Sequence, residues 1–192
     1  MTKTTRILAA AATALLAGVA LTGCTINLGA TSGEHDMGMM DENKTTYTAD
    51  DIMFMQMMIP HHQQAVDMGT LAETRALSPE VKKLAAQIKS EQAPEITQMK
   101  GWLKDANASL DMGHDMGRGG MLSDTEMEAL KNAKGADFDR LYLEGMIQHH
   151  KGAIHMAQMV VDSNNAEVAK LGKAIIDSQT KQITYMESLL KK

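Results

Sequence analysis

Apolar side chains recur at the spacing of an amphipathic helix in four long stretches of the chain. When the first stretch is projected as a helix, with about 100° of rotation per residue, six residues fall on one face and polar residues fall on the opposite face. The inward residues are Phe54, Met58, His61, Ala65, Met68 and Ala72, and those of the third stretch are Tyr142, Met146, His149, Ala153, Met156 and Val160. His62 and His150 lie at the edges of these inward faces. The pattern predicts helices near residues 50–76, 79–103, 137–162 and 166–190.

The chain also contains an internal repeat. A shift of 88 residues lays His61-His62 on His149-His150, with seven identities in nineteen positions. After a one-residue slip, a shift of 87 residues aligns the second predicted helix with the last. Thr48 or Asp50 can cap the first helix, and Ser78 and Asn165 occupy equivalent capping positions before the second and last. The repeat predicts two copies of one helical hairpin, at residues 50–103 and 137–190.

The connection between the hairpins, residues 104–136, decides how they pack. It is long enough to return along a helix of about 26 residues, which is roughly 39 Å long. A long crossover permits two hairpins related by a pseudo-two-fold axis, as in ferritin-like bundles. We therefore predict an all-α, ferritin-like four-helix bundle, although the connection also permits a simple up-down-up-down bundle. A capping box of Ser123 and Glu126 predicts a short extra turn within the connection.

The N-terminus has the pattern of a lipoprotein export signal. Lys3 and Arg6 precede an apolar run, and Leu21-Thr22-Gly23-Cys24 is similar to a bacterial lipobox. That similarity implies cleavage before Cys24 and acylation of its thiol and new amino group. The apolar run is shorter than the ~20 residues of a spanning helix, which argues against an uncleaved anchor. We predict a signal peptide at residues 1–23, a flexible tether containing Met and His at 24–47 and the bundle domain at 48–192.

Composition narrows the function. The formal net charge is −5, and Lys and Arg are scattered, which argues against nucleic-acid binding. The single cysteine excludes a disulfide framework, and an aromatic content of 3 % argues against a large β-sandwich. The unusual feature is the 18 methionines, because methionine is not among the commonest residues of soluble proteins.

The repeat pairs histidine with methionine on the inward faces. The inward stripe of the first helix carries Met58, His61 and Met68, and that of the third carries Met146, His149 and Met156. Packed across a bundle axis, the stripes place two imidazoles and up to four thioethers near one another. Thioether sulfur is soft and never protonated, so such a site favours Cu(I) or Ag(I) over Zn(II), Mg(II) and Ca(II). Imidazole binds metal only when neutral, so part of the affinity is expected to fade below about pH 6.5.

Further candidate ligands lie outside these stripes. Met99 and Met186 are on the inward faces of the second and last helices and can join the site. The tetrapeptide His-Asp-Met-Gly occurs in two predicted loops and supplies His35, Met37, His114 and Met116. We interpret Met53, Met55, Met121, Met127 and Met159 as core packing, and His155 as a solvated surface residue.

An enzyme and a structural lipoprotein are the alternative interpretations. Di-iron ferritin-like enzymes use Glu and Glu-x-x-His motifs. Glu91 and Glu95 of the second helix have Ser178 and Gln182 as their copies, so a symmetric carboxylate cage cannot form. A zinc or Cu(II) site with redox or hydrolytic activity, and a partner-binding lipoprotein in which His and Met are incidental, stay open as alternatives. The chain has no Gly-x-Ser-x-Gly nucleophile elbow.

Three segments carry a family resemblance. They are Met58-Ile59-Pro60-His61-His62-Gln63-Gln64-Ala65-Val66-Asp67-Met68, Glu95-Ile96-Thr97-Gln98-Met99-Lys100-Gly101-Trp102-Leu103 and Met146-Ile147-Gln148-His149-His150-Lys151-Gly152-Ala153. Together they resemble a CopM-type family of ferritin-like, His- and Met-rich extracytoplasmic bacterial proteins that bind copper. The resemblance covers residues 50–190. Carried over by position, it implies the ligands Met58, His61, His62 and Met68 in the first motif and Met146, His149, His150 and Met156 in the second.

The residues and the resemblance together predict a protein without catalytic turnover. It sequesters or delivers Cu(I), and also binds Ag(I), in copper homeostasis. Its expected partners are the membrane, through lipidated Cys24, and a protein that donates or accepts copper. The expected location is extracytoplasmic, at the cell surface or in the periplasm. The sequence leaves the oligomeric state open.

Overall fold

The computed structural model describes residues 46–113, 117 and 119–191, which lie in one compact unit, Glu42–Lys192. Several sequence predictions fall outside the described residues. These are the signal peptide, the lipidation site Cys24, the tether residues His35 and Met37, and the loop residues His114 and Met116.

Four long helices form the bundle, as predicted. They are α1 (Ala49–Arg75), α2 (Pro79–Asp105), α4 (Gly135–Ala157) and α5 (Ala166–Leu189), and a 3₁₀ turn, η1 (Gln158–Val160), extends α4. The predicted extra turn is a nine-residue helix, α3 (Asp124–Asn132). The side chains of Thr48, Ser78, Ser123 and Asn165 cap helices by accepting backbone hydrogen bonds from the first turn. None of the helices in the described part is both long and apolar enough to cross a membrane.

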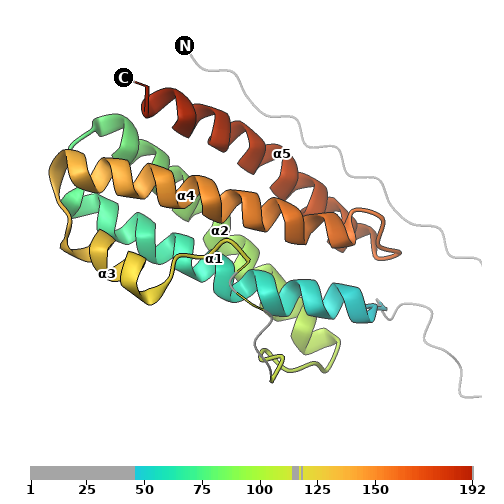
Figure 1. Ribbon diagram of the computed structural model, residues 1–192. Coiled ribbons are helices and arrows are strands. Elements are labelled where there is room, and N and C mark those ends of the chain that lie inside the picture. The colour runs from blue at the N-terminus through green and yellow to red at the C-terminus, as the bar shows by residue number, and fades with distance from the viewer. Residues whose placement is uncertain (1–45, 114–116, 118, 192) are drawn as a thin grey trace, which may run out of the picture. The chain divides into compact units, whose positions relative to one another are not determined.

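The two hairpins pack through α1 and α4, which run antiparallel (Figure 1). Ala76, directly after α1, forms an isolated backbone bridge with Gly135 at the start of α4. Asp139 of α4 accepts hydrogen bonds from the backbone N–H groups of Leu77 and Ser78 at 3.0 and 2.8 Å. Because α2 and α4 therefore begin at the same end of the bundle, the connection between the hairpins has to cross the full length of the bundle. We call this connection, residues 104–136, the linker. This is the predicted ferritin-like crossover, and it excludes the up-down-up-down arrangement.

The core consists of two apolar halves separated by a polar layer. Along α1, Phe54 and Met58 belong to one half, and Ala65 and Met68 belong to the other. Each of the other long helices also passes from one half through the polar layer to the other half, in the same order along α5 and in the reverse order along α2 and α4. The polar layer consists of the buried residues His61, His62, Gln92, His149, His150, Gln179 and Gln182. All inward positions predicted for the first and third helices are buried, and His62 and His150 are fully buried instead of lying at the edge.

Candidate metal centre

The two inward histidines lie against each other at the centre of the bundle. The ring centroids of His61 and His149 are 3.7 Å apart. Each ring also neighbours the next histidine in its own helix, at 6.4 Å for His61 to His62 and 6.2 Å for His149 to His150. The fold therefore brings the histidines of both sequence motifs into one layer.

Backbone oxygens engage one nitrogen of each of these two rings. His61 Nε2 lies 3.0 Å from the carbonyl oxygen of Gly119, and His149 Nε2 lies 2.9 Å from the carbonyl oxygen of His61. A carbonyl oxygen only accepts, so Nε2 donates in both rings. The Nδ1 atoms are buried and have no hydrogen-bond partner. Nδ1 is thus the unprotonated nitrogen, with a lone pair that a metal ion can accept.

The other two histidines are held by side chains of α2 and α5. His62 Nε2 lies 2.7 Å from Glu95 Oε2, and His150 Nε2 lies 2.6 Å from Gln182 Oε1. The Gln182 amide in turn donates to Glu91 Oε2 at 2.7 Å, which fixes its orientation. Both Nδ1 atoms are again buried without a partner. All four rings therefore have the arrangement typical of metal-binding histidines, in which the nitrogen not facing the metal donates to a fixed oxygen.

Burial keeps the rings of His61, His149 and His150 neutral. Desolvation, reinforced by neighbouring His62, lowers the pKa of His61 to about 3. Desolvation also lowers the pKa of His150 to about 4 and the pKa of His149 well below its ordinary value. At neutral pH these three rings carry the Nε2 proton alone, and the second proton does not bind. The loss of metal affinity expected below about pH 6.5 therefore shifts to more acidic pH.

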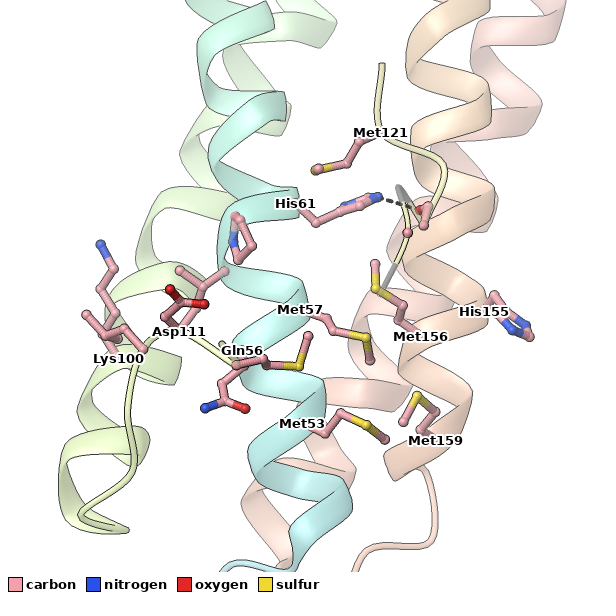
Figure 2. Close-up of a pocket in the computed structure, with 16 residues that line it drawn as sticks. Met53, Gln56, Met57, His61, Lys100, Asp111, Met121, His155, Met156 and Met159 are labelled. Carbon is pink, nitrogen blue, oxygen red and sulfur yellow. Dashed lines mark hydrogen bonds between the residues drawn. The ribbon is translucent and has the colours of Figure 1, made fainter. Parts of the chain in front are cut away.

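A pocket of about 700 Å³ opens beside His61, between α1, the end of α4 and the linker. Six methionines line it, and we call it the methionine pocket: Met53, Met57, Met112, Met121, Met156 and Met159. Figure 2 shows the side chains of Met53, Met57, Met156 and Met159 directed into the space between the two helices. His155, Lys100 and Asp111 also border the pocket. The pocket therefore combines soft sulfur donors with one neutral imidazole in its lining.

The predicted ligands are only partly brought together. His61 and Met156 both line the methionine pocket. Met58 and Met99 are fully buried in the same apolar half as Met156, whereas Met68, Met146 and Met186 are buried in the other half. The four stripe thioethers are divided because α1 and α4 run antiparallel, so each half receives one methionine from each stripe. A metal-binding role for the fully buried residues stays a prediction.

Sequence reasoning missed most of the methionine pocket. Met53, Met121 and Met159 line it instead of filling the core, and Met159 is 39 % exposed. Met57 and Met112 were not recognised as candidates. In contrast, Met55 is fully buried and Met127 packs against the core, as interpreted from the sequence. His155 is exposed, as expected, but it stands at the border of the pocket.

One sequence signal could have revealed these residues. Met53 and Met57 are separated by one helical turn, and so are Met156 and Met159. Met53 and Met57 therefore form a second methionine row on the first helix, and Met159 lies one turn beyond Met156 of the inward stripe. Within the residues described by the structure, no three His, Cys, Asp or Glu side chains are grouped so as to hold a metal ion.

Comparison with known proteins gives consistent matches. The family described as a domain of unknown function, DUF305, matches residues 51–190. The crystal structure of a DUF305 protein from Streptomyces coelicolor, named as secreted, is 33 % identical, with a TM-score of 0.71 over 75 % of this chain and 94 % of that chain. A DUF305 fragment from Deinococcus radiodurans is 29 % identical, with a TM-score of 0.69 over 75 % and 97 % of the two chains.

A copper-bound protein has the same fold. CopM in its Cu(I)-bound form is 34 % identical, with a TM-score of 0.63 over 76 % of this chain and 97 % of that chain. CopM structures also exist in Cu(II)-bound, Ag-bound and apo forms. No curated protein matches the sequence. Because the family match spans most of the chain, including all four bundle helices, this protein belongs to the DUF305 family.

Proposed function

We propose that this protein binds Cu(I), and also Ag(I), at the methionine pocket and holds the ion for sequestration or delivery outside the cytoplasm. The observation that carries the proposal is that six methionines and His61 line one open pocket. Thioether and imidazole donors together favour soft monovalent ions. The lowered pKa of His61 keeps its lone pair free of protons at neutral pH.

The donor set favours copper and silver over harder ions. Zinc sites use Cys, His and carboxylates, and calcium sites use oxygen. No such cluster of three His, Cys, Asp or Glu occurs among the described residues. CopM, which has been solved with Cu(I), Cu(II) and Ag, shares 34 % of its residues with this chain in the Cu(I)-bound structure. This similarity supports copper as the cargo.

We propose binding without catalytic turnover. The two carboxylates of α2 that border the polar layer are already engaged, because Glu95 holds His62 and Glu91 holds Gln182. Their copies in α5 are Ser178 and Gln182. The named proteins of similar structure are CopM and DUF305 proteins. The exposed side chains of Met159 and Leu110 at the pocket are accessible to a protein that donates or accepts copper. Such a protein is the partner that we propose.

We also propose export and membrane anchoring through Cys24, consistent with a Streptomyces coelicolor relative named as secreted. The variant Cys24→Ser should move the protein from the membrane fraction to the soluble fraction of the cell envelope. An unchanged distribution would contradict lipid anchoring at this residue.

The proposed function is tested by an anaerobic Cu(I) titration against a chelator of known affinity, with a parallel Zn(II) titration. The variant Met53→Leu/Met57→Leu/Met159→Leu removes three sulfurs from the pocket with little change in volume. We expect its Cu(I) affinity to fall by more than about 100-fold, beyond the roughly 10–100-fold typical of losing an outer-shell partner. We expect Zn(II) to bind weakly to both proteins.

The matched control is Met127→Leu, which makes the same exchange in α3, where Met127 packs against the core. Its Cu(I) affinity should equal that of the wild type. Wild-type affinity in the triple variant, or a preference of the wild-type protein for Zn(II), would overturn the proposed function.

A further inference from the structure

The linker passes between α1 and α4 and contacts His61 there. We call residues 119–122 of the linker the strap. On the α4 side, it lies so close that a Cβ atom added to Gly152 would come within 1.6 Å of the Gly119 carbonyl oxygen, which is shorter than any non-bonded contact. The Leu122 side chain packs against Gly145, where an added Cβ would lie 3.1 Å from it. Two glycines of α4 therefore make the room in which the strap lies.

On the α1 side, two polar side chains hold the strap. The Gln64 amide makes a two-point clamp on Leu122, because Nε2 donates to the carbonyl oxygen at 2.9 Å and Oε1 accepts from the backbone N–H at 2.7 Å. One turn earlier, His61 Nε2 donates to the carbonyl oxygen of Gly119 at 3.0 Å. Figure 2 shows this hydrogen bond and Met121 beside it. The strap is therefore fixed at both of its ends.

The two copies of the repeat contribute unequally to this arrangement. Gln64 and Gly152 occupy equivalent positions under the 88-residue shift. The first copy thus supplies the clamp, and the second supplies the space. The equivalent histidines differ in the same way, since His61 donates to the strap and His149 donates to the backbone of His61.

We propose that Gln64 is a positioning residue of the methionine pocket, a role that rests on the proposed function. By fixing Leu122, it holds the Gly119 carbonyl as the acceptor for the Nε2–H of His61. This hydrogen bond selects the tautomer in which Nδ1 carries the lone pair for Cu(I). The same clamp keeps Met121 in the pocket wall. Outer-shell partners of this kind typically contribute about 10–100-fold to metal affinity.

The test compares Gln64→Leu with Gln63→Leu. Gln63 precedes Gln64 in α1 but is exposed, and its amide donates to Asp67 on the same helix. In the metal-free protein, long-range ¹⁵N NMR of the His61 ring should show the Nε2–H tautomer for the wild type and Gln63→Leu. Gln64→Leu should lose this single tautomer. Its Cu(I) affinity should fall about 10–100-fold, with no change for Gln63→Leu.

A second variant moves the same carbonyl from the opposite side. Gly152→Ala places a methyl group against Gly119, whereas a Cβ on Gly101 in α2 meets nothing within 4 Å. We expect Gly152→Ala to reproduce the tautomer change and the affinity loss, and Gly101→Ala to show neither. An unchanged tautomer or unchanged Cu(I) affinity in Gln64→Leu would overturn the role of Gln64 alone. A wild-type protein that binds no Cu(I) would overturn the proposed function and this role with it.

Discussion

The two ends of the α1–α4 interface are equivalent by sequence repeat and different in structure. At the open end, Met53, Met57 and Pro60 of α1 line the methionine pocket of about 700 Å³. Their copies in α4 are Leu141, Gly145 and Gln148, which line a cavity of about 240 Å³ at the other end. There α3 and Leu122 cover the helices. We call this the covered end.

The difference follows from the linker. A duplicated hairpin produces two equivalent helix ends, but a single linker joins the copies and has only one α3 to place over them. At the covered end, Met68 is fully buried and Leu71 packs against the core. Their copies at the open end, Met156 and Met159, line the pocket. Duplicated motifs therefore do not imply duplicated sites, because the segment between the copies breaks their symmetry.

The largest expected effect is acid destabilisation of the polar layer that separates the two ends. Burial lowers the pKa values of His61, His149 and His150 in the folded protein, so the unfolded chain binds more protons below about pH 6.5. Stability is therefore complete above pH 6.5 and falls as the pH drops toward the folded pKa values of about 4 and 3. At pH 5 the loss should be about 2 kcal/mol for each of His61 and His150, and His149 adds to it in the same direction.

Denaturant unfolding of the metal-free protein at pH 7 and pH 5 measures this loss. The variant His61→Gln should show a smaller difference between the two pH values than the wild type. His155→Gln, which changes an exposed histidine of the same helix pair, should keep the wild-type difference. Equal stability of the wild type at both pH values would contradict the prediction.

A smaller effect on stability is expected from the segments that lie over the two ends of the α1–α4 interface. Leu130 of α3 is fully buried at the covered end, whereas Leu110 at the methionine pocket is 56 % exposed. Leu130→Ala should lower the free energy of unfolding by about 2–5 kcal/mol, because it leaves a cavity under α3. Leu110→Ala should change it by less than about 0.5 kcal/mol. Urea unfolding of both variants checks the contrast, and similar losses would show that the open end also has a structural cover.

Much of the fold could be predicted because its signals are local. Helical periodicity identified the inward stripes around His61 and His149, and capping residues such as Ser78 and Asn165 marked helix starts. The repeat and the length of the linker predicted the crossover. These signals require only neighbours along one helix or a comparison of two segments.

The site was predicted less completely because it depends on long-range contacts. The proximity of the His61 and His149 rings follows from the inward stripes, which predict two imidazoles near one another. The course of the strap depends on Gln64 and Gly152, whose partners are far away in the sequence. No periodicity shows that a linker leaves one helix end open. Met53 and Met159 therefore resembled core residues until the position of α3 was known.

The smallest expected effect sharpens the comparison by moving a methionine to the covered end. Leu141→Met gives α4 the residue that its copy, Met53, places in the methionine pocket. The exchange conserves volume, so stability should change by less than about 1.5 kcal/mol. The number of Cu(I) ions bound in the anaerobic titration should equal that of the wild type, because α3 and Leu122 cover the new sulfur and the covered end gathers too few thioethers. An additional bound Cu(I) would show that helix sequence alone, and not the linker, decides where the site forms.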